Sequence, residues 1–128
     1  MVTQEFVFFT IGDRGNRDVN PQSVSLDGGK VYRLNLDGSI PDSNPFYNVD
    51  SSKKAIWSYG HRNPQGIIKV TRNVEVNDYE IWIHEHGPRG GDEINIIKYP
   101  KKDEDPLKDR NYGWPKATYG INYSGSEI

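Results

Sequence analysis

Residues 80–99, EIWIHEHGPRGGDEINIIKY, decide the fold class of this chain, because two short apolar runs flank one glycine-rich loop. Each run has the length and the β-branched composition typical of a strand, and the glycines between them favour a turn. A similar unit begins 25 residues earlier, at 55–70, AIWSYGHRNPQGIIKV, with short strands predicted at Ala55–Tyr59 and Ile67–Val70. In both units a tryptophan stands in the strand that enters the loop. The chain is therefore expected to repeat a strand–loop–strand pattern.

Two further runs, Glu5–Ile11 and Lys30–Leu36, extend this pattern towards the N-terminus, and a long polar loop separates them. The chain holds 12 Ile and 9 Val but only 4 Leu and 2 Ala, so it is rich in strand formers and poor in helix formers. The 13 Gly and 8 Pro are spread along its length as turn signals. These features predict an all-β fold.

The chain is long enough for one domain, and we treat 1–128 as a single partial domain. Repeated strand–loop–strand units suggest a β-propeller, in which each blade takes roughly 40–50 residues. The chain therefore holds about three blades' worth of sequence. Three blades cannot close a ring and would leave sheet edges exposed. The chain is thus predicted to be part of a larger fold.

Composition narrows the function classes. Hydrophobic residues make up 34% of the chain, and no stretch is long and apolar enough for a membrane helix. A formal net charge of -2 argues against a general nucleic-acid binder. The absence of cysteine excludes disulfides and thiolate sites. The opening MVTQEFVFF has no basic or long apolar region, so we predict no signal peptide in this chain.

The cluster GHRNPQG, residues 60–66, combines flexible glycines with a proline that restricts the residue before it. Such a loop could present Arg62 and Asn63 to an anionic or carbonyl-rich ligand, because arginine offers a planar fork of donors. A turn whose Arg and Asn bond neighbouring carbonyls is the alternative interpretation.

The second cluster, HEHGPRGGDE, allows three interpretations. His84 and His86 alternate along a strand, a spacing compatible with a transition metal. The backbone carbonyls of Gly87 and Pro88 could instead face a hard cation such as Ca²⁺. The third is a plain glycine-rich hairpin loop in which Asp92 and Glu93 are solvated. Residues 13–18, DRGNRD, lack the spacing of a calcium-binding loop and are interpreted as an ordinary loop.

Read in order, FFTIGDRG, KVYRLNLDGSIP, YGHRNPQG, EHGPRGGDEIN and NYGWP resemble the soluble sugar dehydrogenases that depend on pyrroloquinoline quinone (PQQ), the glucose/sorbosone dehydrogenase family. The resemblance covers nearly the whole chain, and YGHRNPQG together with EHGPRGGDE is highly specific. The second motif, with YGINYSG after NYGWP, is more similar to the aldose sugar dehydrogenase branch than to the glucose dehydrogenase branch.

The resemblance implies a six-bladed β-propeller that binds PQQ at the mouth of its central channel. Members of the family oxidise the C1 hydroxyl of aldoses to lactones and pass the electrons to an acceptor. They use Ca²⁺ beside PQQ and as a structural ion, and they are periplasmic or secreted. For this chain we therefore expect an aldose substrate, PQQ and Ca²⁺.

The same resemblance assigns roles to individual residues. Arg62, Asn63 and His86 match positions that contact the cofactor. Gly87 and Pro88 match residues whose backbone carbonyls hold the Ca²⁺ near PQQ. Glu93 and Tyr112 match positions associated with a structural Ca²⁺.

No catalytic residue is expected within 1–128, because the general-base histidine of the family lies before the segment that FFTIGDRG matches. We therefore expect that base upstream of Met1. His61 belongs to the GHRNPQG motif and is not that base. The chain alone is thus expected to be inactive. The alternatives are a non-enzymatic extracellular propeller that binds other proteins and a truncated product without function.

Overall fold

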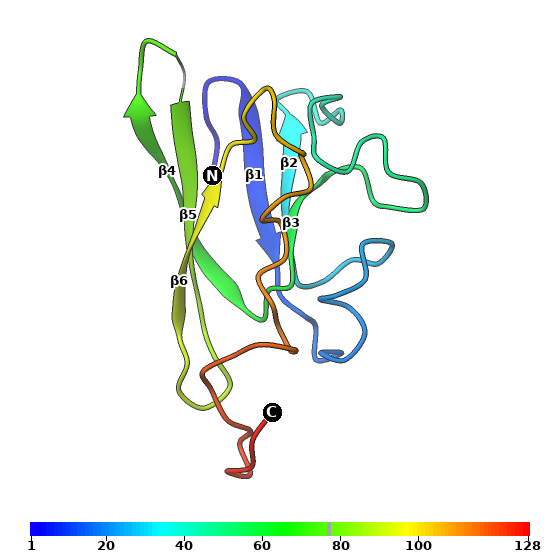
Figure 1. Ribbon diagram of the computed structural model, residues 1–128, viewed down its shortest axis with the longest axis vertical. Helices are drawn as coiled ribbons and strands as arrows, with labels where there is room; N and C mark the ends of the chain where they lie inside the picture. The colour runs from blue at the N-terminus through cyan, green and yellow to red at the C-terminus, as the bar shows by residue number, and fades with distance from the viewer. Residues whose placement is uncertain (77) are drawn as a thin grey trace.

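The computed structural model describes residues 1–76 and 78–128, which form two three-stranded antiparallel sheets (Figure 1). The first sheet contains β1 (Phe6–Ile11), β2 (Lys30–Asn35) and β3 (Ile56–Tyr59), in that order. The second contains β4 (Pro64–Asn73), β5 (Asp78–Glu85) and β6 (Glu93–Lys98). The all-β prediction is confirmed. The described residues include no helix, and hence none long and apolar enough to cross a membrane.

The two units that look alike in sequence have different places in this fold. Residues 86–92 connect β5 and β6, which pair within the second sheet. Residues 60–63 instead connect β3 of the first sheet with β4 of the second. The strand predicted at 67–70 is also longer than expected, because β4 already begins at Pro64, inside the GHRNPQG cluster. Each strand's partner comes from elsewhere in the chain, which local sequence does not specify.

The two sheets share one hydrophobic core. From the first sheet it contains Phe8, Val31 and Trp57, and from the second Tyr79, Ile81, Ile83 and Ile97, all of them buried. A smaller cluster of Tyr32, Phe46 and Ile56 anchors the long loop between β2 and β3. Burying these large side chains is the main favourable contribution to the fold. The alternation of apolar residues along β5 fixes which of its side chains face the core.

Met1 lies beside β1. Its side chain is partly buried and packs against the core that the two sheets share. Its amino group donates to the Phe8 carbonyl at 2.7 Å. The catalytic base expected upstream of Met1 lies outside the described residues, so its position stays a prediction.

Three buried cations tie the irregular segments to this core. The Lys30 Nζ donates to the carbonyls of Asn20 and Gly28, both at 2.6 Å, which holds the loop between β1 and β2 in place. The guanidinium groups of Arg33 and Arg110 lie 4.3 and 4.8 Å from the ring of Trp57. Residues 99–114 therefore return to the first sheet and reach the end where the loops after β1, β3 and β5 lie.

Candidate functional site

Four loop segments, residues 12–15, 60–63, 86–92 and 111–114, meet at one end of the two sheets, and we call them the site loops. The backbone N–H of Asp13 donates to the Arg62 carbonyl at 2.8 Å, and that of His86 donates to the Asn63 carbonyl at 3.1 Å. The Trp114 N–H donates to the Gly60 carbonyl at 2.9 Å. The loop that contains Arg62 is thus bonded to the other three through its backbone.

A buried His61–Glu85 pair lies beneath these loops. The His61 ring is 0% exposed, with its Nε2 2.8 Å from the Ser58 Oγ and its Nδ1 2.9 Å from the Glu85 Oε1. The other carboxylate oxygen of Glu85 accepts the backbone N–H of Arg62 at 2.7 Å. Asn95 also donates to Glu85, at 2.7 Å. One buried carboxylate therefore fixes the His61–Arg62 backbone against β5 and β6.

Glu85 had no role assigned from the sequence, although the signal was present. Counting by twos along β5, Glu85 shares a face with Ile81 and Ile83, which are both buried. A carboxylate at a core position needs hydrogen-bond donors, and the donors come from the loop after β3. His61, which the sequence analysis set apart from the catalytic base, is fully occupied by its two partners and stacks on Tyr112 with ring centroids 4.8 Å apart.

These contacts predict a loss of stability in acid. Burial by itself would raise the pKa of Glu85, but the hydrogen bonds from His61, the Arg62 N–H and Asn95 outweigh it, so the pKa lies below its ordinary value. A carboxyl with a depressed folded-state pKa stabilises the protein above its unfolded-state pKa, and this contribution is lost as the pH falls through the folded value. Urea denaturation of the native protein carrying this chain should therefore show stability falling below about pH 4. The fall should be smaller in Glu85→Gln; an equal fall in both proteins would contradict this assignment.

Arg62 turns its guanidinium towards the loop after β5. Its Nη1 donates to the carbonyls of His86 and Gly87, both at 2.9 Å. Its Nη2 lies 3.3 Å from the Tyr123 hydroxyl, and the group is 5.6 Å from the centre of the Trp114 ring. The predicted cofactor contact Arg62 and the predicted metal-binding carbonyl of Gly87 are thus direct neighbours.

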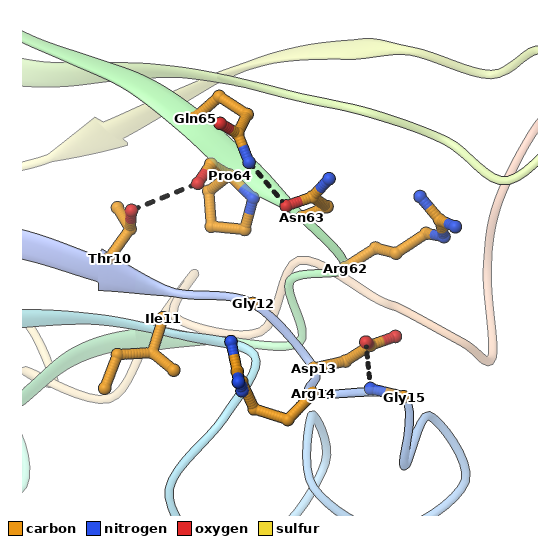
Figure 2. Close-up of a pocket in the computed structure, with 10 residues that line it drawn as sticks. All are labelled: Thr10, Ile11, Gly12, Asp13, Arg14, Gly15, Arg62, Asn63, Pro64 and Gln65. Carbon is orange, nitrogen blue, oxygen red and sulfur yellow. Dashed lines mark hydrogen bonds between the residues drawn. The ribbon is translucent and has the colours of Figure 1, made fainter.

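Asn63 lies on a different side of the same loop. Its Oδ1 accepts a hydrogen bond from the Gln65 Nε2 at 2.7 Å. The –NH₂ group of the Asn63 amide is therefore the part that can donate to a ligand. Figure 2 shows Asn63 on the wall of an open cavity of about 580 Å³. Arg62 also borders this cavity, and so do residues of the loop after β1. The structure therefore brings Arg62 and Asn63 to one cavity.

The loop that carries His86, Gly87 and Pro88 is held by Asp92. The carboxylate of Asp92 accepts the Gly87 N–H at 2.9 Å and lies 3.3 Å from the His86 Nδ1. Both bonds lower the pKa of Asp92 below its ordinary value, and the bond from the Gly87 N–H has the larger effect. Sequence reasoning treated Asp92 as solvated, and its side chain is indeed 66% exposed, but it also fixes the Gly87 peptide. The sequence feature that could have indicated this role is an acidic residue a few positions after the Gly87–Pro88 pair.

The transition-metal interpretation of His84 and His86 gains no support from the geometry. His84 lies on β5, where its ring covers Gly66 of the neighbouring strand. His86 lies beyond the end of β5 and pairs with Asp92. Within residues 1–76 and 78–128, no group of three or more His, Cys, Asp or Glu side chains is placed to hold a metal ion. A site built from backbone carbonyls, as predicted for Gly87 and Pro88, would not need such a group of side chains.

Glu93 and Tyr112, the predicted structural calcium positions, line a second open cavity of about 570 Å³ together with Asn95 and Thr118. The Glu93 carboxylate accepts from the Asn95 Nδ2 at 3.1 Å, and the Tyr112 hydroxyl donates to the Ile96 carbonyl at 2.9 Å. These residues are 19 positions apart in sequence but lie on the same cavity. Their role as calcium ligands stays a prediction.

The sequence profile of the family Glucose / Sorbosone dehydrogenase matches residues 1–128. The chain is 46% identical over 125 residues to the aldose sugar dehydrogenase YliI of Escherichia coli (strain K12), covering 96% of this chain and 29% of that protein. It is 36% identical over 129 residues to the quinoprotein glucose dehydrogenase B of Acinetobacter calcoaceticus, covering 87% of this chain and 23% of that protein.

Among solved structures, the crystal structure of the soluble aldose sugar dehydrogenase of Escherichia coli in the apo-form superposes with a TM-score of 0.77 at 44% identity. The match covers 98% of this chain and 32% of that one. The chain therefore spans about a third or less of the proteins it matches, and its two sheets correspond to part of their fold. Because the family profile matches from the first residue to the last, the chain belongs to the glucose/sorbosone dehydrogenase family.

Proposed function

We propose that this chain is part of a PQQ-dependent dehydrogenase that oxidises the C1 hydroxyl of aldoses to lactones. The relatives include an aldose sugar dehydrogenase and a quinoprotein glucose dehydrogenase. The observation that carries the proposal is the direct bonding of the loop with Arg62 and Asn63 to the loop with His86 and Gly87. Cationic and amide donors are thereby placed beside backbone carbonyls.

This donor set suits PQQ, an ortho-quinone with three carboxylates. PQQ, when bound, would supply the two-electron oxidant that accepts the hydride lost from C1 of the sugar. Arg62, Asn63 and His86 would hold the cofactor, and fixed donors near the quinone oxygens stabilise the negative charge that develops there. The lactone forms when the sugar hydroxyl also loses its proton. We assign that proton to a base upstream of Met1, outside residues 1–128.

Ca²⁺ would be held by the carbonyls of Gly87 and Pro88, with a second, structural ion near Glu93 and Tyr112. Carbonyl and carboxylate oxygens are the ligands that Ca²⁺ prefers. The Gly87 carbonyl already faces a positive charge, since it accepts from Arg62. Asp92 would keep the Gly87 peptide oriented, since its carboxylate accepts the Gly87 N–H.

By membership of this family we also propose that the native protein lies in the periplasm or outside the cell.

His61 takes no part in the chemistry in this proposal. Its ring is buried and bonded at both nitrogens, so it positions Arg62 and Asn63.

The proposal predicts that the native protein carrying this chain reduces an artificial redox dye when given an aldose, PQQ and Ca²⁺. The rate should disappear when PQQ is omitted and should fall when Ca²⁺ is chelated, because both are parts of the site. Absorbance of the dye measures the rate, and a neutral polyol without an anomeric hydroxyl is the control substrate.

No aldose-dependent rate above the PQQ-free blank would contradict the proposal and favour a propeller that only binds other proteins. The 128-residue chain alone should give no turnover. A sugar-dependent rate from that chain would show that its base lies within residues 1–128.

A further inference from the structure

The cavity beside Asn63 carries a guanidinium that the family resemblance did not single out. Figure 2 shows the ten residues that line this cavity of about 580 Å³. Its charged members are two cations and one carboxylate: Arg14, Arg62 and Asp13.

The carboxylate of Asp13 is engaged by the protein. Its Oδ1 accepts the backbone N–H of Gly15 at 2.9 Å, and its Oδ2 accepts the indole N–H of Trp114 at 2.9 Å. Both oxygens therefore serve to build the turn and to tie it to residue 114. A carboxylate held in this way is not directed at either arginine as an ion-pair partner.

The two arginines differ in what they bind. Arg62 donates to the carbonyls of His86 and Gly87 and reaches the Tyr123 hydroxyl. For Arg14, no ion pair or side-chain hydrogen bond is formed with any part of the chain that the structure describes. Figure 2 shows the two side chains pointing in different directions. A ligand can thus meet Arg14 without breaking a bond within the protein, whereas Arg62 already makes three hydrogen bonds there.

Arg14 is also held in an unusual backbone conformation. Its φ of 61° lies in the left-handed region, which residues other than glycine rarely adopt. The turn that enforces it is closed by the bond from Gly15 to Asp13 and by the Asn16 N–H, which donates to the Asp13 carbonyl at 3.2 Å. A hydrogen bond from the Asp13 N–H to the Arg62 carbonyl also fixes this turn to the loop after β3. A strained residue on a well-anchored turn at a cavity rim is an arrangement found at ligand sites.

We propose that Arg14 is the anion-binding residue of this cavity and pairs with a carboxylate of the bound ligand, with the Asn63 amide as a second donor. An arginine without an internal partner matches a carboxylate through two parallel hydrogen bonds. The carboxylate can belong to PQQ, which rests on the function proposed above, or to an acidic sugar such as a uronic acid. The chemistry at Arg14 is the same in both cases.

The first arm of the test measures PQQ binding to the cofactor-free native protein carrying this chain, in the presence of Ca²⁺, by quenching of tryptophan fluorescence. Arg14→Gln should weaken binding about 10- to 100-fold, as expected for the loss of hydrogen bonds to a charged group. Arg14→Gly should do the same, and glycine suits the left-handed backbone, so this variant keeps the turn. Arg72→Gln, at the far end of β4, removes one exposed positive charge and should bind as the wild type does.

The second arm uses calorimetry to compare binding of glucuronate and of glucose. If the carboxylate comes from the sugar, the Arg14 variants should weaken binding of glucuronate alone and leave PQQ binding unchanged. Unchanged binding of both PQQ and glucuronate in Arg14→Gln and Arg14→Gly would overturn the proposal. A wild-type protein that binds no PQQ would contradict the proposed function instead, and the glucuronate arm would still test Arg14.

Discussion

Replacing Glu85 by alanine is expected to destabilise the native protein by about 3 kcal/mol, because it removes a buried carboxylate that accepts several hydrogen bonds. The carboxylate is 5% exposed and receives hydrogen bonds from His61, from the Arg62 N–H and from Asn95. Alanine removes the partner of the buried His61 ring and the acceptor of the partly buried Arg62 N–H, whereas Asn95 keeps its hydrogen bond to Glu93. Urea denaturation followed by tryptophan fluorescence measures the loss.

Glu80→Ala is the matched control, because Glu80 lies on the same strand and, among the residues that the structure describes, accepts a hydrogen bond from the Trp82 indole alone. We expect it to cost about 1 kcal/mol or less. The loop after β3 should also loosen in Glu85→Ala, with faster hydrogen exchange at the Arg62 amide. Equal costs for the two substitutions would show that the carboxylate of Glu85 does not hold this loop.

The second large effect concerns Gly60, whose φ of 79° lies in the left-handed region. A Cβ at this position would collide with the Asn111 side chain and would lie 2.8 Å from the backbone nitrogen of Gly113. Gly60→Ala should therefore cost about 3 kcal/mol, the sum of the left-handed backbone and of overpacking. It should also push residues 111–113 away from the loop that carries Arg62.

Gly38 separates the two contributions, because its φ is 85° but an added Cβ would meet no atom of the described residues within 4 Å. Gly38→Ala should cost only about 1 kcal/mol, the backbone term alone. Thermal melting of both variants of the native protein gives the comparison. If Gly60→Ala costs no more than Gly38→Ala, the contact of residues 111–113 with Gly60 is unimportant for stability.

The predictions from the sequence were strongest where the pattern is local. The alternation and the β-branched residues indicated all six strands, and the predicted bounds were close for every strand except β4. Its first residue, Pro64, looks like a turn residue, but it belongs to the sheet because Glu85 of β5 is its partner. The motifs also indicated the family, which the match over residues 1–128 confirmed.

The site was predictable only in part. The motif positions named Arg62, Asn63, Gly87 and Pro88, and the structure places their loops in contact. The bond between the Arg62 guanidinium and the Gly87 carbonyl could not be predicted, because it joins residues 25 positions apart through side-chain direction. The same holds for Arg14, which in sequence is one charged residue in a polar loop.

Most of the strands, the turns and the family could therefore be predicted from the sequence, because short-range alternation and glycine or proline placement reflect the backbone of their own segment. Only the tertiary structure decided that Glu85 carries the loop after β3, that Gly60 must stay small and that Arg14 has no partner within the described residues. The physical reason is that hydrogen bonds, close contacts and unpaired charges depend on which distant segments meet, and the packing of the two sheets sets those meetings.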